Sequence, residues 1–299
     1  MRFSVGLATD RVEYGSEFVS AEGITEIAQA AEAAGYHACF VTDHPYPVQR
    51  WLDGGGHHAL DPFVALTVAA TATSRIRLHT HIVVLPYRNP FLTAKAGLTL
   101  DLVSSGRLIL GAAAGYLKGE FQALGADFDA RNELSDEALI AIKRAWTEDD
   151  VKMEGRHFRA RGNTMHPRPV QRPHPPIWIG GNSKRAIRRA VELAQGWVPF
   201  PNTAAMSPFT RSPALESDDE LSARIAFARE HARAIGRTEP LDICYSLDAF
   251  AGDGIDAGRT TERVDALEKL GVGWVTVGFP ARSRAEYVEK LRAFAGAVL

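Results

Sequence analysis

The feature that most constrains this chain is a regular alternation of strand-like and helix-like segments along its length. Short apolar runs typical of buried strands are each followed by a segment with helically spaced apolar residues. We predict eight strands, at residues 3–9, 37–42, 76–85, 107–113, 177–179, 197–200, 241–247 and 274–279. Eight strand–helix units are typical of a parallel (β/α)8 barrel whose helices cover the outside.

We expect residues 1–299 to form one domain, an α/β TIM barrel with insertions after strands four and six. The excess length lies at 125–176, which includes Pro-rich runs at 166–169 and 173–176, and at 199–217, which is rich in Pro, Ser, Thr and Asn; we interpret both as loops or lids. An open doubly wound sheet is the alternative fold, although eight units fit barrel closure better.

Charge and composition exclude several classes of function. The chain carries 34 Lys and Arg against 36 Asp and Glu without a basic stripe, which argues against nucleic-acid binding. Apolar stretches such as 65–72 are shorter than the roughly 20 residues that a membrane span needs. The N-terminus resembles a strand rather than a signal peptide, and Cys39 and Cys244 are interpreted as core residues. We therefore expect a soluble cytoplasmic protein.

Candidate reactive residues follow the predicted strands, because a barrel works at the carboxyl ends of its strands. Asp43 and His44 follow the second strand, and a carboxylate beside an imidazole suits proton transfer or the orientation of a bound ring. The alternative is an ordinary surface turn, since Pro45 and Pro47 come next.

His79 and His81 lie two residues apart in the third strand, so their imidazoles share one face. Some barrel hydrolases bind a metal with such a pair, but on the first strand and with a carboxylate from the last. Here the last strand ends at Gly278-Phe279-Pro280, without a carboxylate. We therefore predict no metal site and interpret the pair as facing the barrel interior or a ligand.

A strand–glycine–helix junction occurs at Gly180-Gly181-Asn182-Ser183. Glycines let the backbone approach a ligand, and the exposed amides of the following helix favour an anion such as phosphate. An ordinary helix capped by Ser183 explains the same residues.

Aromatic side chains are predicted around the same mouth, where they could line an apolar pocket for a planar ligand or pack in the core. They are Tyr46, Trp51, Tyr87 and Phe200, which we take as the candidate substrate contacts.

Five motifs in a fixed order resemble the bacterial luciferase-like family of flavin- and deazaflavin-dependent oxidoreductases. They are VTDH at 41–44, VVLPYRNP at 83–90, the spaced pairs LG, GY, EF and LG within 110–125, PPIWIGG at 175–181 and GWVP at 196–199. The family fold is a (β/α)8 barrel, in agreement with the strand count.

The resemblance implies a reduced isoalloxazine-type ring at the barrel mouth, supported by a bulge in the third strand near His81 and Ile82, often with a cis peptide. It implies cofactor contacts, including phosphate contacts, from residues of four strand ends. They are Asp43, Thr80, His81, Ile82, Ala114, Gly115, Tyr116, Gly180, Gly181, Asn182 and Ser183. His44 would orient the substrate or move a proton.

Two positions depart from branches of the family. Where the sugar-phosphate dehydrogenase branch has an acidic Glu, this chain has Tyr116, a phenol that can donate a proton but is a different acid. Where the luciferase branch has a basic residue, this chain has Ala114. The resemblance therefore favours an F420-dependent oxidoreductase, with His44 and Tyr116 as catalytic candidates.

Two alternatives stay open. One is an FMN-dependent monooxygenase that uses oxygen and flavin reduced by a separate reductase. The other is a non-catalytic flavin-binding barrel. We expect a small-molecule substrate, no nucleic acid, no membrane and a homodimer, since dimers through barrel helices are common in the family.

Overall fold

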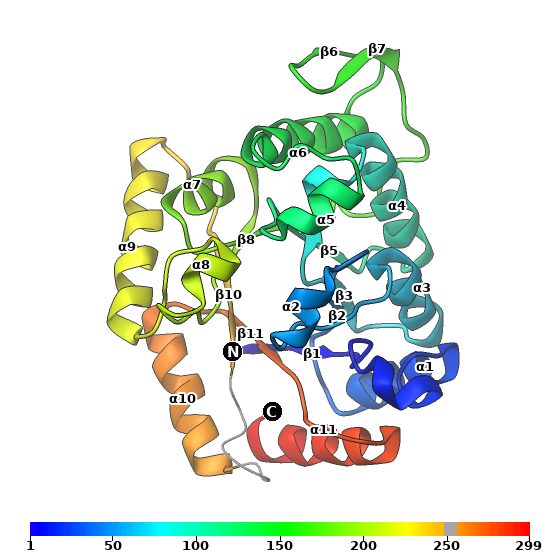
Figure 1. The fold of residues 1–299 in the computed structure, drawn as a ribbon, viewed down its shortest axis with the longest axis vertical. Coiled ribbons are helices and arrows are strands. Elements are labelled where there is room, and N and C mark those ends of the chain that lie inside the picture. The colour runs from blue at the N-terminus through cyan, green and yellow to red at the C-terminus, as the bar shows by residue number, and fades with distance from the viewer. Residues whose placement is uncertain (248–255) are drawn as a thin grey trace.

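The computed structural model describes residues 1–247 and 256–299, and they form a closed parallel barrel (Figure 1). Neighbouring strands follow the order β3-β2-β1-β11-β10-β9-β8-β5-β4, and an additional β3–β5 pairing closes the ring. The barrel strands are β1 (Arg2–Gly6), β2 (Ala38–Val41), β3 (Arg77–Thr80), β4 (Val83–Val84), β5 (Leu108–Ala113), β8 (Ile177–Gly180), β9 (Gly196–Val198), β10 (Asp242–Ser246) and β11 (Trp274–Val277). The predicted barrel is confirmed.

The predicted third strand is interrupted in its middle, so that β3 and β4 are two halves of one barrel strand. Leu78 and His79 pair with Leu108 and Ile109, an offset of 30 residues, whereas Val83 pairs with Ala112, an offset of 29. One extra residue is therefore accommodated between β3 and β4, which defines a bulge. The His81–Ile82 peptide bond within it is cis, and the bulge lies where the resemblance implied it.

Eight helices among the described residues alternate with these strands around the outside (Figure 1). They are α1 (Ala21–Ala33), α3 (Pro62–Ala72), α4 (Pro90–Val103), α6 (Arg131–Thr147), α7 (Lys184–Leu193), α9 (Asp218–Ala234), α10 (Ala257–Leu270) and α11 (Arg284–Val298). Side-chain caps fix several helix starts: the Asp61 carboxylate accepts from the first turn of α3, and the Asn89 side chain does so for α4.

Shorter elements lie between the barrel units. They are the 3-10 turns η1 (Val12–Glu17) and η2 (Leu85–Tyr87), the helices α2 (Gln49–Asp53), α5 (Lys118–Ala123) and α8 (Ser207–Thr210), and the strands β6 (Val151–Glu154) and β7 (Arg159–Asn163). No helix among the described residues is both long and apolar enough to cross a membrane.

The insertion at 125–176 includes α6, in agreement with the helix that the sequence indicates at 133–147, and the rest of it is neither a plain loop nor a lid. It contains an antiparallel β6–β7 hairpin, which packs Val151 and Met153 against Ala141 of α6. The Glu137 carboxylate on α6 accepts hydrogen bonds from the backbone of His157 and Phe158 at the hairpin turn. The hairpin therefore lies on the outer surface of α6, at the periphery of Figure 1 and away from the barrel axis.

Candidate active site

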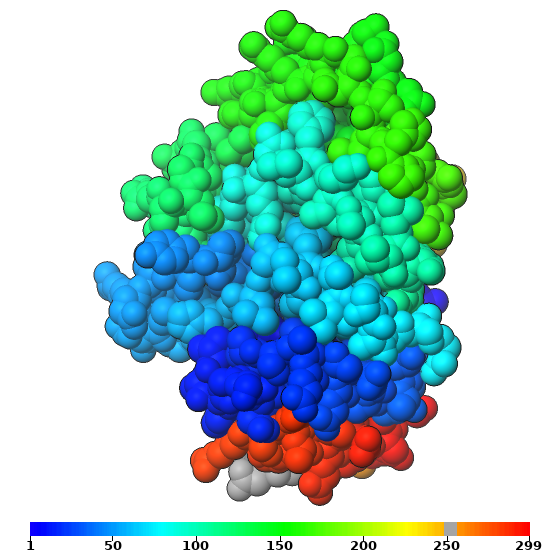
Figure 2. All heavy atoms as spheres, turned by 90° about the vertical axis from the view of Figure 1, so that its right-hand side faces the viewer, coloured from blue at the N-terminus to red at the C-terminus, as the bar shows by residue number. Residues whose placement is uncertain are grey.

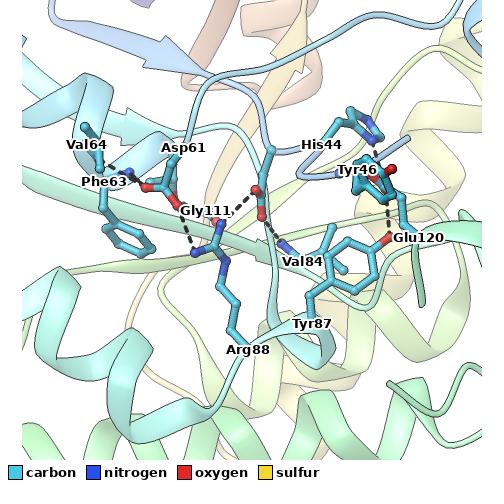
Figure 3. Close-up of polar contacts among 12 residues, drawn as sticks. His44, Tyr46, Asp61, Phe63, Val64, Val84, Tyr87, Arg88, Gly111 and Glu120 are labelled. Carbon is cyan, nitrogen blue, oxygen red and sulfur yellow. Dashed lines mark hydrogen bonds and ion pairs between the residues drawn. The ribbon is translucent and has the colours of Figure 1, made fainter. Parts of the chain in front are cut away.

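Asp43 follows β2 and holds the bulge from behind. Its Oδ2 accepts a 3.0 Å hydrogen bond from the Val84 amide, and its Oδ1 accepts one of 3.0 Å from Arg88 (Figure 3). Arg88 also bonds the Asp61 carboxylate at the start of α3. Burial raises the pKa of Asp43, and the Arg88 guanidinium opposes that shift. The carboxylate is thus engaged with the backbone and with Arg88.

The bulge is packed closely against β5 and β8. The Thr80 hydroxyl donates to the Gly111 carbonyl at 2.9 Å. A Cβ on Gly111 would lie 2.0 Å from the Thr80 carbonyl oxygen, and one on Gly180 would lie 2.4 Å from Ile82. Glycine at these two positions therefore lets the neighbouring strands approach the bulge.

His79 and His81 point into the barrel interior, with ring centroids 5.0 Å apart. Burial lowers the pKa of His81 to about 4. The pKa of His79 is also lowered, mainly by burial and to a smaller extent by the neighbouring His81. Among the described residues no group of three or more His, Cys, Asp or Glu is arranged to hold a metal ion. Both imidazoles are therefore neutral interior groups near pH 7.

His44 has a buried carboxylate partner, but it is Glu120 of α5 and not Asp43. The distance between His44 Nδ1 and Glu120 Oε2 is 3.2 Å, and Glu120 is fully buried. The Tyr87 hydroxyl donates to the same oxygen at 2.9 Å, and the Tyr46 amide donates to Oε1 at 3.1 Å (Figure 3). The expected pairing of Asp43 with His44 is wrong, because the Asp43 carboxylate is engaged elsewhere.

Glu120 also fixes which nitrogen of His44 is available. A carboxylate only accepts hydrogen bonds, so His44 Nδ1 must carry the hydrogen. In the neutral ring the Nε2 atom is then left as an acceptor. Sequence reasoning noted Glu120 as part of a motif but assigned it no role.

Aromatic rings enclose the His44 imidazole. The ring centroid of Trp51 lies 4.3 Å away, that of His57 lies 5.0 Å away and that of Tyr116 lies 6.1 Å away. Burial, with a smaller contribution from Glu120, raises the pKa of Tyr116 to about 12. Tyr116 therefore remains a protonated hydrogen-bond donor at neutral pH.

The candidate aromatic contacts lie in three different places. Trp51 and Tyr87 gather around His44 and Glu120, whereas the Tyr46 side chain is 69% exposed. Phe200 instead lines a separate hollow of about 820 Å³ at the carboxyl ends of β9 and β10. The structure therefore does not bring the four residues into one pocket.

The glycine junction after β8 has the expected backbone. Gly181 has a φ of +121°, which favours glycine, and Ser183 caps α7 by accepting from the Ala186 amide. Gly115 after β5, next to Ala114, also has a positive φ of +75°. Asn182 is different, because its side-chain amide donates to the Phe200 and Pro213 carbonyls and thus holds the 199–217 segment.

A family model described as "Luciferase-like monooxygenase" matches residues 1–261. The FMNH2-dependent dimethylsulfone monooxygenase of Pseudomonas putida is 30% identical over 200 residues, covering 65% of this chain and 52% of that protein. The crystal structure of a monooxygenase from Streptomyces bottropensis has a TM-score of 0.82 at 23% identity, covering 99% of this chain and 98% of that chain. The coenzyme F420-dependent tetrahydromethanopterin reductase from Methanopyrus kandleri has a TM-score of 0.74 at 18% identity, with the same two coverages.

Proposed function

The chain belongs to the luciferase-like monooxygenase family of flavin-dependent oxidoreductases, and on that premise we propose that it oxygenates a small organic substrate with reduced FMN. Bound reduced FMN would supply two electrons, so that one atom of dioxygen enters the substrate and the other leaves as water. We expect a separate reductase to deliver the reduced flavin.

The bulge between β3 and β4 is the observation that carries this proposal. It interrupts the barrel wall at the mouth, and Asp43 holds it in place through the Val84 amide. Nearby, the Thr42 hydroxyl and His81 Nδ1 are buried without a hydrogen-bond partner. Because buried polar atoms normally have partners, these two atoms fit a ligand with polar edges. The residues present therefore suit a flavin ring against the bulge.

The side chains have distinct roles in the proposed reaction. Thr80, His81 and Ile82 would support the ring, while the backbone at Gly115 and at Gly181 to Ser183 would hold the phosphate end. His44 would accept or return a proton at Nε2, since Glu120 holds Nδ1. Trp51 would limit the access of water to that imidazole.

F420 is the second candidate cofactor. Ala114 supports it, because a basic phosphate contact of the luciferase branch is missing there. FMN is favoured over it because the named relative at 30% identity uses reduced FMN, whereas the F420-dependent reductase is similar in fold at 18% identity. The sequence favoured F420 over FMN, and this proposal favours FMN over F420.

Equilibrium binding of oxidised FMN and of oxidised F420 to the apo-protein, followed by fluorescence, tests the choice. We expect FMN to bind at least tenfold more tightly than F420, and chemically reduced FMN to support oxygen consumption once a substrate is found. Tighter binding of F420 would overturn the FMN assignment in favour of the second candidate. If neither binds, the bulge is not a flavin platform.

The non-catalytic flavin-binding barrel is distinguished in the same experiment. It requires FMN binding without any turnover, and it gives His44 no function. Substitution His44→Gln is expected to leave FMN affinity within about twofold while lowering turnover at least tenfold, within the usual contribution of a general acid or base. Unchanged turnover in that variant would remove His44 from the mechanism.

A further inference from the structure

Three cationic side chains converge on the ring of Phe128, between α5 and α6. The charged group of Arg131 lies 4.1 Å from the ring centroid, that of Arg211 lies 4.9 Å away and that of Lys118 lies 5.9 Å away. Groups within 5 or 6 Å of one centre lie within about 10 Å of each other, roughly one Debye length at 0.1 M ionic strength. Arg211 therefore acts on Arg131 as a like charge, and the exposed Lys118 adds a third positive charge beside the same ring.

The cluster has almost no negative charge to balance it. Within the described ranges 1–247 and 256–299, none of Lys118, Arg131 and Arg211 makes an ion pair. Burial lowers the pKa of Arg131, Arg211 lowers it further, and Asp129 opposes the shift.

The three residues come from connections at the working end of the barrel. Lys118 begins α5 after β5, Arg131 begins α6, and Arg211 lies in the 199–217 segment after β9. The Arg185 side chain, in the first turn of α7 beside the Gly181 to Ser183 junction, is close enough to lower the pKa of Arg131 as well. Arg185 itself is paired with Asp136.

The cluster is also connected to the candidate reactive residues through packed rings. The Phe128 ring contacts Phe121 with centroids 5.1 Å apart, and Phe121 contacts Tyr87 at 4.6 Å. Tyr87 donates its hydroxyl hydrogen to Glu120, the partner of His44. Two packed rings, Phe121 and Phe128, therefore separate the cluster from Tyr87 and Glu120.

We propose that Lys118, Arg131 and Arg211 bind an anionic group, a phosphate or a carboxylate, of the molecule that occupies the barrel mouth. Charges held together without a counterion favour such a ligand, because an anion would form charge-assisted hydrogen bonds with several of them at once. Two sources carry this chemistry, the phosphate of the cofactor and an acidic group of the substrate. The proposed function enters only in the identity of the molecule that carries the anionic group. The cluster also supplies positive charge that is missing at position 114, where this chain has an alanine.

Calorimetric titration of the full chain at low salt tests the site, with inorganic phosphate and succinate as separate probes. We expect saturable binding of at least one probe, weakened at least tenfold by Arg131→Gln and by Arg211→Gln. Arg233→Gln is the matched control, because Arg233 is exposed in the last turn of α9. Loss of a repelling charge should leave the unfolding temperature of the Arg211→Gln apo-protein equal to or above that of the wild type.

FMN and riboflavin, which differ by the phosphate, distinguish the two sources. A tenfold loss of FMN affinity in both variants, with riboflavin affinity unchanged, assigns the cluster to the cofactor phosphate. Loss of succinate binding with both flavin affinities unchanged assigns it to an acidic substrate. Binding of neither probe by the wild type, or equal binding by all variants, overturns the proposal. Phosphate or succinate binding without any flavin binding would uphold the anion site and reject the proposed function.

Discussion

Asp43 and Glu120 are buried carboxylates with different partners at the same end of the barrel. Asp43 bonds the backbone of the bulge and Arg88, while Glu120 accepts from His44, Tyr87 and the Tyr46 amide. Adjacency in the sequence suggested that Asp43 would serve His44. That inference failed because successive residues at a strand end point to opposite sides, so the partner came from α5, 76 residues along the chain.

Glu120→Gln should release the His44 ring from its fixed tautomer. Gln has nearly the same shape but offers one acceptor oxygen and an NH2 group, so the three donors around it cannot all be satisfied. We expect turnover to fall about 10- to 100-fold, with flavin affinity little changed. Nitrogen NMR of labelled histidine should show mixed His44 tautomers in the variant. A tautomer identical to wild type, together with full turnover, contradicts this role; Glu133→Gln on the surface is the control.

The interior histidines should make the protein sensitive to mild acid. The pKa of His81 is lowered from 6.5 to about 4, so the unfolded chain binds more protons than the folded one between these values. Stability from this group is full above pH 6.5 and decreases as the pH falls to 4, by on the order of 3 kcal/mol. Urea unfolding at several pH values should show a shallower dependence for His81→Gln. The exposed His58→Gln should behave like wild type, and an unchanged slope in His81→Gln would refute the assignment.

At the scale of elements, the strands and helix caps could be predicted from the sequence, whereas the bulge in the third strand and the β6–β7 hairpin were not read from local patterns. Apolar runs indicated the eight barrel strands, and the Asp61-Pro62 and Asn89-Pro90 pairs indicated two helix starts, because both signals are local. The bulge was implied by family resemblance, since nothing in the run 76–85 marks a break. The β6–β7 hairpin was missed although residues 151–154 alternate between buried and exposed. The prolines that follow it at 167–176 favoured a loop.

Gly111→Ala should test how closely β5 must approach the bulge. The new Cβ would lie 2.0 Å from the Thr80 carbonyl oxygen, a clash that only a shift of the surrounding backbone can relieve. We expect a loss of about 1 to 3 kcal/mol in unfolding free energy and at least tenfold weaker flavin binding. Gly273→Ala is the matched control, because a Cβ at that position would have no atom within 4 Å. Wild-type stability and affinity in Gly111→Ala would show that the approach is not required.

At the scale of the whole molecule, α3 and α4 expose three large apolar side chains. The segments of α3 and α4 lie on the face shown in Figure 2. Val64 of α3 and Leu92 and Val103 of α4 are 68%, 72% and 50% exposed. The hydroxyls of Thr67 and Thr99 between them donate to their own helices. The exposed Lys95 of α4 donates to the His166 carbonyl, so apart from its charge this face offers methyl groups to a partner.

We expect the α3 and α4 face to be buried in the predicted homodimer. Leu92→Glu would place a charge in that interface, so sedimentation should show a monomer where the wild type is a dimer. Ile235→Glu, which alters an equally apolar but separate position at the end of α9, should remain dimeric. A wild type that sediments as a monomer, or a dimeric Leu92→Glu, would disprove the assignment.

The single extra residue between β3 and β4 is not needed for the barrel to close. Removing it would let the third strand pair with β5 without a break, because the offsets on its two sides differ by only one. The shortened chain would be a more regular barrel without the bulge that we propose as the support of the flavin ring. Under the proposed function, the extra residue therefore serves the ligand and contributes nothing to closure of the barrel.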